Sequence, residues 1–86
     1  MENSENRIAM LAVIITDTDS VDAVNAALHE YGEFIVGRLG LPLRERGVNT
    51  ISLVLDAPVN SVNALTGRLG AIRGVSAKAL FAKLSR

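Results

Sequence analysis

The chain has 86 residues, 49% of them hydrophobic, and its nine basic side chains balance its nine acidic ones. This length makes a single domain with one small core, so some of the apolar surface is expected to face a partner. The sequence contains no cysteine, which excludes disulfides, thiolate metal sites and cysteine nucleophiles.

The longest apolar run, residues 8–15, has eight residues, whereas a helix that spans a bilayer needs about 20. The preceding residues, MENSENR, are net acidic, and TDTD follows the run in place of a small-residue cleavage site, unlike a secretory signal. We therefore expect a cytoplasmic protein that has no membrane partner.

The charges are unevenly distributed along the chain. Residues 1–33 hold seven acids and one Arg, while residues 66–86 hold five bases and no acid. The bases are evenly spread, with only Phe81 nearby to stack on a base, so attraction between the chain ends is favoured over a nucleic-acid patch. No direct nucleic-acid binding is expected.

We expect residues 1–6 to form a disordered tail and residues 7–86 a single domain. Residues 8–15 are apolar at every position, which predicts a central strand that covers both faces of a sheet. Next comes a helix with Asp19 as its N-cap, an end at Gly32 and an apolar stripe at helical spacing. The stripe is Val21, Val24, Leu28 and Tyr31.

The second part of the chain repeats this order. Residues 33–42, with glycines and a proline, predict an edge or bulged strand, and LRERG predicts a turn. Residues 48–56 alternate, with Ile51, Leu53 and Leu55 on one face and Thr50, Ser52, Val54 and Asp56 on the other. A helix then follows from Pro58 until Gly70 or Gly74, and residues 75–84 predict a last strand. The apolar stripe of this second helix is Val59, Val62, Leu65, Leu69 and Ile72.

The predicted order β-α-β-β-α-β is that of the α+β, ferredoxin-like class, with one antiparallel four-stranded sheet and two helices on one face. The tetrapeptide GRLG occurs twice, at residues 37–40 and 67–70. The first copy falls on the second strand and the second copy in the second helix. We expect Gly40 to be needed for a bulge, a positive φ or the close approach of a partner or ligand, and Gly67 to be a tolerated helix glycine.

Several functions of this fold lack the residues that they need. RNA-recognition modules stack bases on aromatic side chains of the central strands, and residues 8–15 and 48–56 contain none. No serine lies in a recognisable catalytic motif, so we expect no catalytic residues and no enzyme activity. His29 is the only histidine. We favour a solvent-exposed histidine without a function over a metal ligand, because a metal site would require His29 from several subunits.

Three segments resemble the family of iron-only hydrogenase system regulators. They are the run H-E-Y at residues 29–31, the G-R-L-G-L-P segment at residues 37–42, and L-T-G-R-L-G-A-I-R-G-V at residues 65–75. The resemblance implies an ACT-like fold, a regulatory role and a homo-oligomer, either dimer or tetramer. The loop TDTDS lacks the glycine with which ACT domains admit an amino acid, and the cysteine ligands of nickel repressors are absent.

The candidate ligand-binding residues are Asp17, Asp19, Arg38 and Gly40, and the sequence leaves the cofactor unknown. Two functions remain open at this point. One is a regulatory module that senses a small-molecule effector, and the other is a ligand-free assembly or scaffold protein. In either case we expect oligomerisation through the sheet face opposite the helices, onto which Val54 points.

Overall fold

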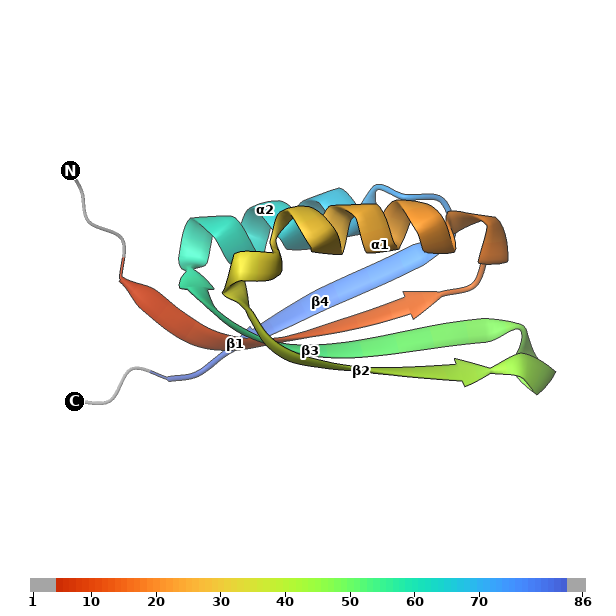
Figure 1. The fold of residues 1–86 in the computed structure, drawn as a ribbon, viewed down its shortest axis with the longest axis horizontal. Helices are drawn as coiled ribbons and strands as arrows, with labels where there is room; N and C mark the ends of the chain where they lie inside the picture. The colour runs from red at the N-terminus through yellow and green to blue at the C-terminus, as the bar shows by residue number, and fades with distance from the viewer. Residues whose placement is uncertain (1–4, 84–86) are drawn as a thin grey trace.

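The computed structural model describes residues 5–83, and its elements follow the predicted order (Figure 1). The strands are β1 (Asn6–Ile15), β2 (Ile35–Leu43), β3 (Val48–Pro58) and β4 (Val75–Phe81). The helices are α1 (Val21–Glu30) and α2 (Val59–Gly70). Short 3-10 turns occupy Thr18–Ser20, Gly32–Phe34 and Arg44–Arg46. Of the expected tail, residues 1–4 lie outside the described residues and Asn6 opens β1; Leu84 of the expected last strand also lies outside them.

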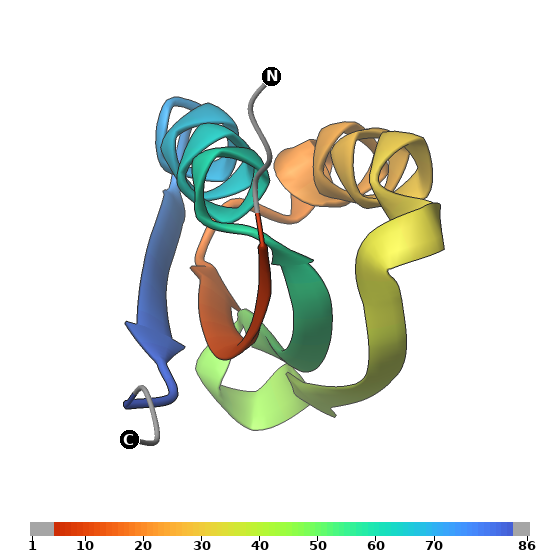
Figure 2. The same ribbon diagram turned by 90° about the vertical axis from the view of Figure 1, so that its left-hand side faces the viewer.

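The four strands form one antiparallel sheet in the order β2-β3-β1-β4. Both helices lie side by side on one face of this sheet, and the other face is not covered by the described residues (Figures 1 and 2). This arrangement confirms the predicted α+β, ferredoxin-like fold. It also confirms the central position of β1, which pairs with β3 on one side and β4 on the other.

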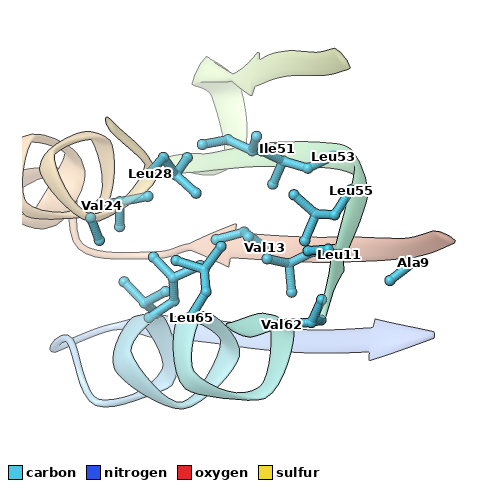
Figure 3. Packing of buried hydrophobic residues seen from close by; sticks show 14 of the residues in the cluster. Ala9, Leu11, Val13, Val24, Leu28, Ile51, Leu53, Leu55, Val62 and Leu65 are labelled. Atoms are coloured by element: carbon cyan, nitrogen blue, oxygen red, sulfur yellow. The ribbon is translucent and has the colours of Figure 1, made fainter. Parts of the chain in front are cut away.

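The core lies between the sheet and the two helices (Figure 3). Alternate residues of β1 and β3 point into it, as the period of two along a strand requires. The helices add the apolar stripes predicted for them, with Ala27 as an additional member on α1. Each fully buried Leu or Val contributes about 1.5–3 kcal/mol of hydrophobic free energy. The buried set is Ala9, Leu11, Val13, Ile15, Val24, Ala27, Leu28, Ile51, Leu53, Leu55, Ala57, Val62, Leu65, Leu69 and Val75.

The start of α1 differs from the prediction that Asp19 caps it. A 3-10 turn precedes the helix, and the Asp17 side chain caps that turn by accepting a hydrogen bond from the Asp19 backbone N–H at 3.0 Å. Ser20 occupies the N-cap position of α1, but its hydroxyl donates to the Arg73 carbonyl at 2.7 Å instead of capping the helix. The hydroxyl of Ser20 thus links this turn to the chain that follows α2.

The bulge and the positive φ that were expected at Gly40 are absent. The irregularity in β2 lies between Ile35 and Gly37, where the pairing with β3 shifts register at Val36. Gly40 has no positive φ, and a Cβ atom there would contact only the Thr50 carbonyl oxygen, at 3.9 Å. The bulge lies four residues earlier, close to the 3-10 turn that precedes β2, so Gly40 lies in a regular part of the strand.

Gly74 is required both by its backbone angle and by its close surroundings. Its φ is +72°, and a Cβ atom there would lie 2.6 Å from the Asp17 Cβ and 3.0 Å from the Asp17 backbone nitrogen. Its carbonyl accepts a hydrogen bond from the Thr16 backbone N–H at 2.8 Å. The turn before β4 is therefore packed directly on the loop after β1, which only a residue without a side chain permits.

We expect Gly74→Ala to lower the melting temperature by roughly 5–20 °C. Strain of this kind costs about 1–3 kcal/mol, and each kcal/mol shifts the midpoint of a domain this size by about 4–8 °C. Gly67→Ala is the matched control, because a Cβ atom at Gly67 meets nothing within 4 Å. Thermal melts by circular dichroism measure both variants; equal melting temperatures would contradict the close packing at Gly74.

Candidate functional site

A hollow of about 260 Å³ lies between the start of α1 and the strands β2 and β3. It forms there because Gly40 pairs with Ile51, a core residue on the helix-facing side, and contributes no side chain to that side. The lining residues are Ile15, Val21, Asn25, Arg38, Gly40, Leu41, Pro42, Asn49, Thr50 and Ile51. The hollow therefore combines an aliphatic floor with amide and guanidinium groups.

Arg38 is the charged group of this hollow. It pairs with Leu53 in the sheet, so it points toward the helices, and its Nη2 donates a hydrogen bond to Asn25 Oδ1 of α1 at 3.0 Å. A guanidinium carries five N–H donors in a planar fork that fits a carboxylate with two parallel bonds. The arrangement can bind a small anion while the aliphatic floor contacts its apolar part.

The structure brings together two of the four candidate ligand-binding residues, Arg38 and Gly40. Asp17 and Asp19 lie instead in the turn before α1. The Asp17 carboxylate accepts from the Asp19 N–H and lies 3.5 Å from Arg73 Nε, while Asp19 is exposed. Asp17 is thus part of the contact between this turn and the chain after α2, whereas Asp19 contributes its backbone N–H within the turn.

Three polar residues of the hollow were not anticipated from the sequence: Asn25, Asn49 and Thr50. The Thr50 hydroxyl donates to the Leu41 carbonyl at 2.9 Å and so links the two strands. Asn25 lies one helical turn after Val21, which is a signal that it borders the apolar stripe. The pairing of Pro42 with Asn49 depends on the register of β2 with β3, which the sequence alone did not supply.

His29 is exposed on α1. Within residues 5–83 no group of three or more His, Cys, Asp or Glu side chains is placed to hold a metal ion. The metal role of His29 stays the less favoured of the two interpretations.

The arginines of the two GRLG copies both bond to α1. Arg38 reaches Asn25 from the sheet, and Arg68 reaches Glu30 from α2, through two hydrogen bonds to the carboxylate. The hydrogen bond from Arg68, supported by its charge, lowers the pKa of Glu30 below its ordinary value of 4.5. The exposed side of α1 is therefore held by polar contacts from both of its neighbours.

The Glu30–Arg68 pair predicts a small pH dependence of stability. Because the pKa of Glu30 is lower in the folded chain, the pair contributes above the unfolded value near 4.5 and its contribution disappears as pH falls through the folded value. Glu30→Gln should therefore be slightly less stable than wild type at pH 7 and equally stable in strong acid. Urea unfolding at both pH values measures this, with Glu33→Gln as control; a difference that persists in acid would contradict the assignment.

The uncovered face of the sheet, called the open face below, is a second candidate surface. Eight large hydrophobic residues of the described chain are 45–72% exposed; seven point onto this face and Val36 lies at the bulge of β2. A shallow hollow of about 530 Å³ lies among them, over the small side chain of Ala12. The exposed hydrophobic residues are Ile8, Met10, Ile14, Val36, Leu39, Leu41, Leu43 and Leu80.

The topology defines the chain as a ferredoxin-like, ACT-like α+β domain. The chain belongs to the TM1266-like family, "Iron-only hydrogenase system regulator, putative", whose model matches residues 7–79. It is similar to the uncharacterized protein TM1266 from Thermotoga maritima, with 35% sequence identity and a TM-score of 0.88 over 92% of this chain and 100% of that one. The expected family is therefore confirmed.

A more distant structural likeness shows the fold alone. A formyltetrahydrofolate deformylase from Pseudomonas putida KT2440 superposes with a TM-score of 0.63 at 16% identity, over 88% of this chain and 29% of that enzyme. None of the curated proteins compared with the chain matches it. No helix among residues 5–83 is long and apolar enough to cross a membrane.

Proposed function

We propose that the chain is a regulatory module of the iron-only hydrogenase system that senses a small carboxylate and acts as a homo-oligomer, without catalysing a reaction. The observation that carries this proposal is the hollow of about 260 Å³ that Arg38 and Gly40 line together. Its volume is near the lower end of known ligand pockets, which favours a small effector. The family to which the chain belongs supplies the regulatory context.

The proposed ligand binds through Arg38. The guanidinium holds one amide oxygen, that of Asn25, at 3.0 Å, and a carboxylate is a stronger acceptor because its hydrogen bonds are charge-assisted. The bound acid replaces or bridges the bond to Asn25, while its apolar part lies on Ile15 and Ile51. Binding therefore changes a contact between β2 and α1.

The same strand connects the hollow to the open face. Along β2, Arg38 and Gly40 point toward the helices, while Leu39 and Leu41 point to the opposite side and are 58% and 52% exposed. A ligand that orders this edge strand alters the positions of these leucines. It then favours the assembly state to which it binds more tightly. The apolar open face also supports the alternative, a scaffold that assembles without a ligand.

Arg38→Gln tests the sensing part. We expect it to abolish the thermal stabilisation that small carboxylic acids give to the wild type, because an uncharged amide cannot form the two charge-assisted bonds. Arg44→Gln, in the exposed turn after β2, is the matched control and should respond like wild type. The measurement is a thermal-shift screen of short aliphatic and aromatic acids, followed by calorimetry of any acid that raises the midpoint.

Native mass spectrometry of the purified wild-type protein gives a second readout of sensing. A retained organic acid that is lost in Arg38→Gln supports the sensing proposal. Failure of every acid to bind, with an oligomer still present, supports the ligand-free scaffold instead.

Val54→Lys tests assembly. Val54 pairs with Met10 at the middle of the open face, so a lysine there places a charge inside any interface on that face. We expect a lower assembled mass by light scattering with an unchanged circular dichroism spectrum. Asn63→Lys, on the exposed side of α2, should leave the mass unchanged; a monomeric wild type at high micromolar concentration would rule out the assembly.

A further inference from the structure

The strand positions on the open face carry two charges within the described residues. Asp56 on β3 pairs with Ile8, and Lys78 on β4 pairs with Ala12. Both side chains are exposed, and the salt bridges of the described chain involve neither of them. An apolar surface thus carries one acid and one base at separate places.

The register places Met10 midway between these two charges. Ile8 and Ala12 lie two residues before and two residues after Met10 on β1, and Asp56 and Lys78 are their partners on opposite sides of that strand. Consider a two-fold axis that runs parallel to the sheet, directly above Met10, and perpendicular to the line from Asp56 to Lys78. Rotation about this axis exchanges the position of Asp56 with that of Lys78. Two copies related by this axis place Asp56 of each over Lys78 of the other.

We infer that a second copy of this chain packs face to face on the open face about this axis, with Met10 against Met10 and two reciprocal Asp56–Lys78 pairs. The inference rests on the assembly part of the proposed function and deepens it by fixing the arrangement of the copies. It is independent of the sensing part. The interface is isologous, as in most homodimers.

The surroundings of Met10 fit this arrangement. Its direct partners on the open face are Val54 on β3 and Leu80 on β4. Met10 is 50% exposed, and Leu80 is 72% exposed, the largest value for a large hydrophobic residue within residues 5–83. The hollow over Ala12 lies beside them and can receive side chains of the second copy. A charge in an apolar interface needs an opposite charge beside it. A partner that did not place a base over Asp56 and an acid over Lys78 would leave both charges unpaired in the interface.

A charge exchange tests the reciprocal pairs. Asp56→Lys and Lys78→Asp each place like charges opposite one another twice per dimer, so each should raise the dimer dissociation constant by about tenfold or more. The double variant Asp56→Lys/Lys78→Asp restores both pairs with inverted signs and should return to within a few-fold of wild type. Asp22→Lys, on the exposed side of α1, is the control for a change of net charge.

Cross-linking tests the position of the axis. The chain has no cysteine, so a single-cysteine variant can be linked only to another copy. Facing sheets lie about 10 Å apart, too far for a direct disulfide, so the probe is a thiol reagent with two reactive ends and an ethylene spacer. Met10→Cys should be linked efficiently, whereas Ile14→Cys, on the same strand and face and 45% exposed, should not, because it lies away from the axis.

Analytical ultracentrifugation and denaturing electrophoresis give separable outcomes. Restoration in the double variant together with linking at Met10 supports the inference. A dimer in which the double variant is no better than the single ones, or in which Ile14→Cys links as well as Met10→Cys, overturns this arrangement and leaves the proposed assembly standing. A wild type that stays monomeric overturns both.

Discussion

The whole structure depends on β1 being apolar on both faces. Both sets of its alternate residues are apolar, but within residues 5–83 the two α-helices cover one face of the sheet and leave Met10 50% and Ile14 45% exposed on the other. The connections β1-α1-β2 and β3-α2-β4 each join two parallel strands, and the right-handed rule for such crossovers places both helices on the same face. The hydrophobic burial that folds the domain is therefore obtained on one side, and residues 5–83 leave the opposite face uncovered.

The edge strand β2 relates the two candidate surfaces. A strand directs successive side chains to opposite faces, so Arg38 lines the hollow beneath α1 while Leu39 lies on the open face. As an edge strand it pairs only with β3 in this sheet. A segment held on one side by its neighbour is more easily displaced than a central strand, which makes β2 the natural element to carry a change from one face of the sheet to the other.

The sequence predicted the elements that depend on periodicity. The two helical stripes, the alternation of β3 and the central place of β1 all follow from the apolar pattern, and the structure has them. The roles that it missed depend on contacts distant in the chain. Gly74 is required because the turn before β4 packs on Asp17, and Asn49 enters the hollow through the register of β2 with β3. Local sequence contains no direct signal for such contacts.

The two GRLG copies have the same residues but different structural roles, because side-chain directions repeat with a different period in a strand and in a helix. In β2, with a period of two, Leu39 lies opposite Arg38 and is exposed; in α2, with a period of 3.6, Leu69 is fully buried while Arg68 reaches Glu30 on the outside. The second copy therefore builds the core, and the first contributes to both surfaces. Of the segments that carry the family resemblance, residues 37–42 are consequently the ones through which ligand and assembly would be coupled.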